Sequence, residues 1–143
     1  MLKIALAADH AGYQWKEVIK SHLEAQGYRI HDFGTDSVQP VDYPDFMRPA
    51  AESVAGGECD IGIIFGGSGN GEAMVANKVR GIRCAVCWNE VSARLAKEHN
   101  NANMISIGGR MVDKSEAIAM VDVWMTAEFQ GGRHIRRIEK IEP

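Results

Sequence analysis

Hydrophobic positions along the chain follow two alternating patterns. Short apolar runs are separated by longer segments in which apolar residues recur every three to four positions. In the first of these segments Trp15, Val18, Ile19, His22 and Leu23 fall at i, i+3, i+4, i+7 and i+8, which predicts an amphipathic helix. The apolar runs, which predict strands, are residues 3–8, 29–33, 61–65, 82–88 and 104–107.

Residues that start or stop helices mark the boundaries of the helical segments. Gly27 is expected to end the first helix, and Pro44 suits the first turn of the second. Pro49 is expected to kink or restart that second helix, because proline lacks an N–H group. Asn89 is a candidate N-cap for the helix that follows it. The other helical segments are residues 71–79 and 115–128, and a basic stretch at 133–141 ends the chain.

Strands that alternate with helices predict an open, mainly parallel sheet with helices on both faces. The expected fold class is therefore a three-layer, Rossmann-like α/β fold with five strands. A chain of 143 residues fits one domain, residues 1–143, which buries about two-thirds of its unfolded surface. Ligands of such sheets bind beyond the carboxyl ends of the strands. The polar residues and glycines that follow the strands are Asp9, His10, residues 66–72, Trp88, Asn89, Gly108, Gly109 and Arg110.

The charge pattern limits the classes of partner. The formal net charge is −3, and acidic and basic residues are interspersed along the chain. No polybasic stripe predicts binding to nucleic acid or to a membrane surface, so a small molecule is the expected ligand. The N-terminal apolar run is too short for a signal peptide, and no apolar stretch is long enough to cross a bilayer. We therefore expect a cytoplasmic protein.

The three cysteines do not predict disulfide or metal chemistry. Their odd number argues against a secreted disulfide framework. Cys84 and Cys87 form a C-x-x-C motif within a predicted strand, where residues three apart point to opposite faces of the sheet. Since no second C-x-x-C is present for a zinc site, we interpret them as buried structural thiols.

The glycine-rich stretch FGGSGNGE at residues 65–72 is the strongest local signal of a binding site. It lacks the Lys-Ser/Thr of a nucleotide P-loop, and its fit to G-x-G-x-x-G is poor. Glycines before a helix let backbone N–H groups face a phosphate or a developing oxyanion. A tight turn without a ligand is the alternative. Glu72 likewise has the simpler interpretation of a favourable first-turn helix acid at the surface.

Motifs along nearly the whole chain resemble one family. They are ALAADHAG, VDYPDF, GGSGNGE, ANKVRGIRCAVC, AKEHNNANMISIGGR and GGRHIRRI. In this order they resemble type B ribose-5-phosphate isomerases and the related galactose-6-phosphate isomerase subunits. The resemblance implies aldose–ketose isomerisation of a phosphosugar through an enediolate, without a metal ion or other cofactor. It also implies a homodimer whose active sites lie at the subunit interface, with a tetramer as the alternative assembly.

The resemblance also assigns roles to individual residues. Many members have a cysteine as the proton-transferring base where this chain has Gly66, and a second branch uses a glutamate that matches Glu72. Ser68 would add a hydroxyl donor, and His99 would assist opening of the sugar ring. The substrate-binding residues implied are Asp9 and His10 beside the sugar, Gly67, Gly69, Asn70 and Gly71 in the anion hole, Asn100 next to His99, Arg110, Arg133 and Arg137 on the phosphate, and also Tyr43.

Several alternatives stay open from the sequence. The scaffold can belong to a non-catalytic module that binds a sugar phosphate or nucleotide, and an isomerase can act on a six-carbon phosphosugar instead. The basic tail can be a solvated helix face docked by its isoleucines, with Arg133 and Arg137 sharing one side if it is helical. His99 can serve only as a helix-dipole partner. His22 and His31 are interpreted as surface or packing residues, and His134 is left unassigned.

Overall fold

Each apolar run of the sequence forms a strand in the computed structural model, which describes residues 1–143. The strands are β1 (Lys3–Ala8), β2 (Arg29–Asp32), β3 (Ile61–Gly66), β4 (Cys84–Cys87) and β5 (Met104–Gly108). The helices are α1 (Tyr13–Ala25), α2 (Pro44–Ala55), α3 (Asn70–Asn77), α4 (Glu90–Glu98), α5 (Lys114–Thr126) and α6 (Arg133–Glu139). The predicted order of elements is confirmed, with boundaries that differ by one or two residues at most ends.

All strand pairs are parallel, and the order across the sheet is β2-β1-β3-β5-β4. The chain leaves β1 in one direction to form β2 and then returns to the other side of β1 to form β3. The carboxyl ends of β1 and β3 therefore flank the switch in strand order, where ligands bind in open α/β sheets. The residues that directly follow β1 and β3 are therefore the ones expected to contact a ligand.

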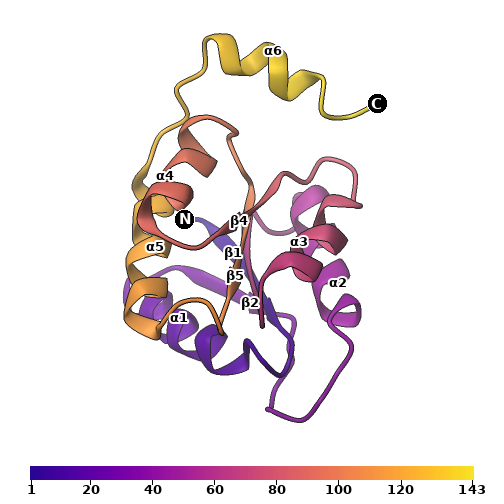
Figure 1. Cartoon of the computed structure of the whole chain (residues 1–143), viewed down its shortest axis with the longest axis vertical. Coiled ribbons are helices and arrows are strands. Elements are labelled where there is room, and N and C mark those ends of the chain that lie inside the picture. The colour runs from indigo at the N-terminus through magenta and orange to yellow at the C-terminus, as the bar shows by residue number, and fades with distance from the viewer.

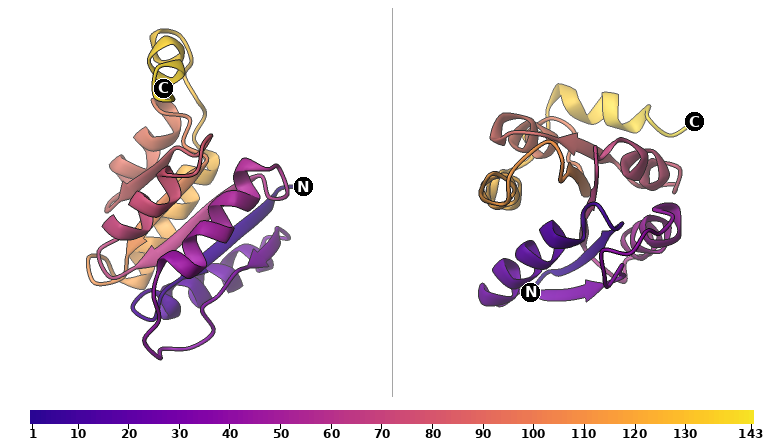
Figure 2. Two further views of the ribbon diagram at one scale, coloured as in Figure 1. Left: turned by 90° about the vertical axis from the view of Figure 1, so that its right-hand side faces the viewer. Right: turned by 60° about the horizontal axis from the view of Figure 1, so that its bottom comes forward.

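Two helical layers bury the two faces of the sheet (Figure 1 and Figure 2). One apolar cluster joins alternate β1 residues such as Ile4 and Leu6 to α1, α4 and α5. The other joins Ala5 and Ala7 to α2 and α3. This alternation confirms the three-layer α/β fold, because successive strand residues point to opposite faces.

The cysteines behave as the sequence analysis predicts. Cys84 packs in the α2 and α3 cluster and Cys87 in the opposite one, and all three thiols are free and buried. Burial raises the pKa of the Cys84 thiol well above its ordinary value and that of Cys87 to about 12. Both sulfurs are therefore protonated, poor nucleophiles at neutral pH.

The expected restart of the second helix at Pro49 is wrong. Helix α2 runs without interruption from Pro44 to Ala55 with Pro49 inside it. The missing N–H of Pro49 leaves one helical bond unmade, but Met47, Ala50, Ala51 and Val54 are buried against the sheet on the same helix. Their packing outweighs the local preference of proline, since tertiary burial supplies most of the stability of a helix.

The end of α1 follows its sequence signal. Gly27 has φ +91°, and the N–H groups of Gly27 and Tyr28 donate to the carbonyls of Glu24 and Leu23. These two bonds form a Schellman motif, for which glycine is favoured because it tolerates positive φ. The turn places the chain to begin β2 alongside β1.

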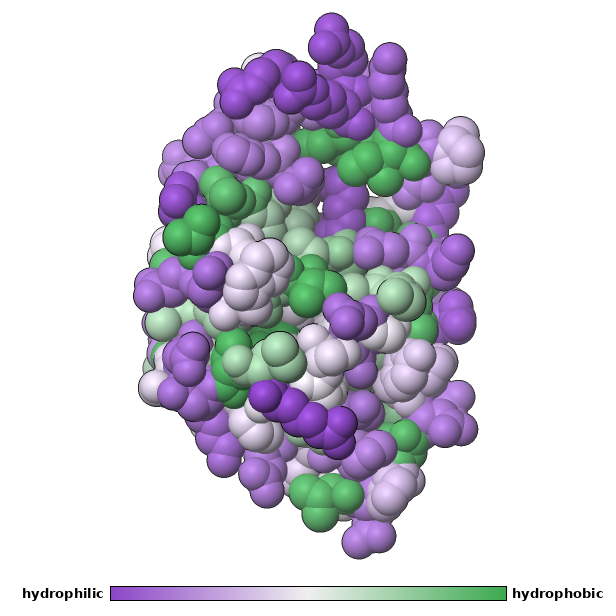
Figure 3. Space-filling view, viewed as in Figure 1, coloured by the Kyte–Doolittle hydropathy of each residue, from purple (hydrophilic) through white to green (hydrophobic).

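The basic tail forms α6, which lies outside the two helical layers at one end of the molecule (Figure 1). Figure 3 shows hydrophilic side chains over the outer surface of this end and apolar side chains below it, towards the rest of the molecule. No helix in the structure combines the length and the apolar character needed to span a bilayer.

Candidate active site

Asp9 begins the site at the carboxyl end of β1. Its side chain is buried, and its Oδ1 accepts hydrogen bonds from the N–H groups of Ala11 (2.9 Å) and Gly12 (3.0 Å). A Cβ at Gly12 would overlap with the backbone of Phe65 in β3, so glycine allows α1 to start close to β3. The aspartate thus has a fixed position beside the switch point.

The glycine loop after β3 is shaped by close contacts with its neighbours. Gly69 has φ +86° at the N-cap of α3, and its carbonyl accepts a 2.7 Å hydrogen bond from the buried Ser106 hydroxyl. A methyl group at Gly67 would lie 2.9 Å from the Arg110 guanidinium, and one at Gly71 would lie 2.7 Å from Tyr43. The loop therefore contacts the Arg110 guanidinium at Gly67 and the Tyr43 ring at Gly71.

The loop also has free hydrogen-bond donors. The backbone N–H groups of Ser68 and Gly71 make no hydrogen bond within the chain. The Ser68 Oγ accepts from the Asn70 N–H (3.2 Å), so its hydroxyl proton can point elsewhere. Together with the N-terminal end of α3, these donors form a place that favours negative charge.

Glu72, in the first turn of α3, is the central acid of this group. The interpretation of Glu72 as a surface helix acid is wrong, because its side chain is only 4% exposed and its Oε2 is buried without a hydrogen-bond partner. Burial raises the pKa of Glu72, and the charge of Asp9 raises it further, although backbone N–H groups at Glu72 and Gly69 act against this. A carboxyl group whose pKa is raised by burial is suited to accept and return a proton.

Gly66 explains how Glu72 reaches its position. A Cβ at residue 66 would overlap with the carboxyl group of Glu72. The carboxyl group therefore occupies the space that a cysteine side chain at this position would need. Gly66 and Glu72 are a matched pair, since any larger residue at 66 displaces the acid.

An ion pair between a buried lysine and a half-buried aspartate holds the start of the loop that follows β2. Lys16 on α1 is 1% exposed and contacts both carboxylate oxygens of Asp32 at 2.7 and 2.8 Å. Burial opposes ionisation of Asp32, but the hydrogen bonds from Lys16, Gly34 and Lys20 hold its pKa below the ordinary value. The loop after Asp32 is thereby anchored where it passes β1.

The same loop contributes directly to the site. The Gly34 carbonyl and the Thr35 N–H both bond to Ala8, the last residue of β1, at 2.7 Å. Further along, the Val41 N–H donates to His10 Nδ1 (3.1 Å). A neutral His10 therefore carries its proton on Nε2, where it is a hydrogen-bond donor.

A second group of predicted site residues lies at the other end of the sheet. His99 is the C-cap of α4, and its imidazole stacks on that of His134 with ring centroids 4.6 Å apart and an angle of 17° between the planes. The two histidines share a cavity of about 410 Å³ with Asn100, Arg137 and two isoleucines of the tail. Arg133 lies on α6 next to His134, one helical turn before Arg137.

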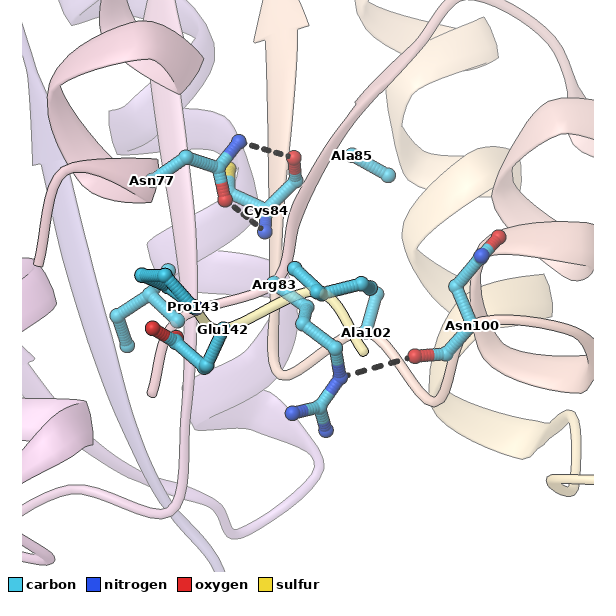
Figure 4. A pocket seen from close by; sticks show the side chains of 10 residues that line it. Asn77, Arg83, Cys84, Ala85, Asn100, Ala102, Glu142 and Pro143 are labelled. Carbon is cyan, nitrogen blue, oxygen red and sulfur yellow. Dashed lines mark hydrogen bonds between the residues drawn. The ribbon is translucent and has the colours of Figure 1, made fainter. Parts of the chain in front are cut away.

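A further cavity of about 370 Å³ opens beside Asn100 and the start of β4. Figure 4 shows the Asn77 side chain pairing with the backbone of Cys84, and the Arg83 guanidinium donating to the Asn100 carbonyl. The last three residues of the chain line its opposite wall. Since Arg83 directly precedes β4, Asn100 lies at the amino end of the sheet.

The predicted site residues are therefore divided between two ends of one chain. Asp9, His10, Tyr43, the 67–71 loop, Glu72 and Arg110 lie beyond the carboxyl ends of β1, β3 and β5, whereas His99, Asn100, Arg133 and Arg137 lie near the amino ends. The six-residue strands β1 and β3 separate the two groups by about 20 Å, at ~3.3 Å per residue. No single phosphosugar can contact both groups in one chain.

The structure adds residues that the sequence analysis does not assign. His134 joins the second group through its stack on His99, and no local motif signals a contact between residues so distant in sequence. Lys16 and Asp32 hold the start of the loop that leads on to Val41 and Tyr43. Lys16 lies on the apolar stripe of α1 with Ile19 and Leu23, and a charged residue at such a position is the signal by which the sequence could have identified it.

At the switch point of this α/β sheet, a buried carboxylate lies near backbone N–H groups that have no partner. A protein with such a site can transfer a proton next to a bound anion. A family model described as Ribose/Galactose Isomerase matches residues 4–141, and the chain belongs to this family.

Individual relatives match over nearly their whole length. Ribose-5-phosphate isomerase B of Escherichia coli (strain K12) is 43% identical over 141 residues, covering 99% of this chain and 95% of that protein. The solved structure of Clostridium thermocellum ribose-5-phosphate isomerase B has a TM-score of 0.97 and 49% identity, covering 98% of this chain and 95% of its own. Ribose-5-phosphate isomerase B from Mycoplasma genitalium, solved with bound ribulose-5-phosphate, has a TM-score of 0.94 and 40% identity, covering 97% and 93%.

Proposed function

We propose that the protein is an isomerase that interconverts ribose 5-phosphate and ribulose 5-phosphate, with Glu72 as the acid–base residue. The observation that carries the proposal is the buried Glu72 carboxyl group, whose Oε2 has no partner and which lies at the end of a donor-rich glycine loop. A protein that only binds a phosphosugar needs the donors but has no use for a desolvated base. The names of the relatives and the ribulose-5-phosphate in one of their structures support the same substrate pair.

The chemistry at C1 and C2 follows from this arrangement. The Glu72 carboxylate removes the proton from C2 of the open-chain aldose, and the electron pair forms the C1–C2 double bond of an enediolate. The N–H groups of Ser68 and Gly71 and the Ser68 hydroxyl stabilise the negative charge on oxygen. Glu72 then returns a proton to C1, while the proton of the O2 hydroxyl passes to O1, so that C2 becomes the carbonyl carbon of the ketose and O1 its hydroxyl oxygen.

Ring opening precedes this step, because ribose 5-phosphate is mainly a furanose. His99 accepts the proton of the C1 hydroxyl as the bond from C1 to the ring oxygen breaks, and the ring oxygen takes up a proton from solvent water. Arg133 and Arg137 then hold the phosphate with planar guanidinium groups, which suit phosphate oxygens. Asn100, next to His99, contacts the sugar.

These roles require two copies of the chain. A two-fold axis perpendicular to the strands brings the carboxyl end of one sheet beside the amino end of the other. The edge strand β4 offers a surface for this contact, with a groove between β4 and α3 that includes Val86 and Met74, the latter 66% exposed. In this homodimer Glu72 of one protomer works with His99 and the arginines of its partner. The free, buried thiols suit a reducing compartment such as the cytoplasm.

The proposal is tested by turnover of ribose 5-phosphate and by Glu72→Gln. The variant keeps the size of the side chain but removes its basicity, so kcat should fall by about 10² to 10⁴-fold while KM changes little. The exposed first-turn acid of α4 provides the control, and Glu90→Gln should retain wild-type rates.

Three outcomes would contradict parts of the proposal. Binding of ribose 5-phosphate without turnover would make the protein a binding module. Faster turnover of allose or galactose 6-phosphate would move the substrate to six-carbon sugars. A Glu72→Gln variant with normal kcat would remove Glu72 from the chemistry.

A further inference from the structure

His134 has an unusual position next to the proposed ring-opening residue. It is 7% exposed, and its ring lies nearly parallel to that of His99, with 4.6 Å between the centroids. His99 ends α4 and His134 begins α6, so the stack joins two helices at the amino end of the sheet. The ring face is thus the contact through which His134 can affect His99.

The polar atoms of His134 do not hold its ring in place. Its Nε2 is fully buried and has no hydrogen-bond partner, so the ring is positioned by its stack on His99. Burial lowers the pKa of His134, and the positive charges of Arg133 and Arg137 lower it further. A neutral imidazole adds no positive charge beside His99, and its π face attracts a cation placed over it.

We infer that His134 is a positioning residue for ring opening: its neutral ring fixes the plane of the His99 imidazole and stabilises the imidazolium that forms when His99 takes the C1 hydroxyl proton. This inference rests on the proposed function and assigns to His134 a role that acts through His99. It applies to the ring-opening step alone, because His134 lies at the opposite end of the chain from Glu72.

The two chemical steps can be measured separately. Ribulose 5-phosphate carries its phosphate on the hydroxyl that would close a five-membered ring, so it is an open chain. Deuterium incorporation at its C1 in D₂O requires the enediolate step but no ring opening. Net isomerisation of ribose 5-phosphate requires both steps.

Two substitutions of similar volume at His134 distinguish the contribution of its aromatic face from that of its ring nitrogens. His134→Leu removes the ring and should lower kcat for ribose 5-phosphate by roughly 10-fold or more, part of the 10² to 10⁴-fold that acid–base catalysis contributes. C1 exchange in ribulose 5-phosphate should stay within about 2-fold of wild type, since the enediolate step is intact. His134→Phe keeps a stacking face and should restore most of the forward rate. His31→Phe, a remote histidine stacked on Phe33, is the control and should match wild type.

A double-mutant cycle gives a readout that a purely structural role would not move. With His99→Ala already present, His134→Leu should change the forward rate by less than about 2-fold, because its effect acts through His99.

Loss of both net isomerisation and C1 exchange in His134→Leu would overturn the inference, as would equal defects in the Leu and Phe variants or a wild-type rate in His134→Leu. If His134→Leu fails to fold, a His134→Phe variant that is slow on ribose 5-phosphate but normal in exchange contradicts the stacking role. A wild-type protein that neither isomerises nor exchanges would instead contradict the proposed function itself.

Discussion

At the scale of single residues, Glu72 shows how a fold raises the pKa of a carboxyl group. Gly66 leaves room for the carboxyl group, the sheet and α3 remove it from water, and Asp9 adds a like charge nearby. The sequence identifies the residue, but it cannot show the burial, because a glutamate in the first turn of a helix is usually exposed. The burial depends on the strand order that brings β1 and β3 together.

This environment predicts a pH-dependent cost to stability. The folded state holds the Glu72 proton more tightly than the unfolded state, so the ionised carboxylate destabilises the fold increasingly as pH rises from about 4.5 through its raised pKa. Denaturant unfolding should therefore show Glu72→Gln gaining stability over wild type between pH 4.5 and pH 8. Glu90→Gln, at an exposed site, should show no such trend. A Glu72→Gln advantage that is the same at every pH, or absent, would mean that burial does not raise this pKa.

At the scale of elements, periodicity and cap residues were sufficient to predict the strands and helices. Strand geometry alone predicts that Cys84 and Cys87 point to opposite faces of the sheet, which the structure confirms. Gly27 ends α1 as predicted, with the positive φ that glycine tolerates. Pro49 is the exception, since packing of α2 on the sheet overrides a local preference. The tail is helical, which places Arg133 and Arg137 on one face, but helicity alone does not distinguish a phosphate clamp from a solvated surface.

Substitutions on α6 separate these two interpretations. Arg137→Ala should lower kcat/KM for ribose 5-phosphate by about 10- to 100-fold, since a hydrogen bond to a charged group contributes about 1.5 to 3 kcal/mol. Arg137→Lys should recover only part of this, because lysine keeps the charge but loses the guanidinium fork. Arg136→Ala, an exposed change on the same helix, is the control. Identical kinetics for Arg136→Ala and Arg137→Ala would return α6 to a structural role.

At the scale of the whole molecule, the division of the site is the feature that the sequence could least reveal. Arg110, Arg133 and Arg137 are all assigned to one phosphate by the family resemblance, yet Arg110 lies at the carboxyl end of the sheet and the other two near the amino end. The cause is topological. Helix α4 starts after the carboxyl end of β4 and runs back along the sheet, so His99 and Asn100, which follow it, lie at the amino end of the strands. A linear pattern gives residue types and order, but not which end of a parallel sheet each residue reaches.

The most direct test of this account mixes two inactive variants. If Glu72 of one protomer works with His99 of its partner, each mixed dimer of Glu72→Gln and His99→Ala chains has one intact site and one site with both defects. After subunit exchange at equal concentrations, half of the dimers are mixed, so ribose 5-phosphate isomerase activity should return to about a quarter of the wild-type value. Sedimentation should show a dimer throughout. Activity that stays at the level of the separate variants, or a fully active monomer, would contradict a site shared between two chains.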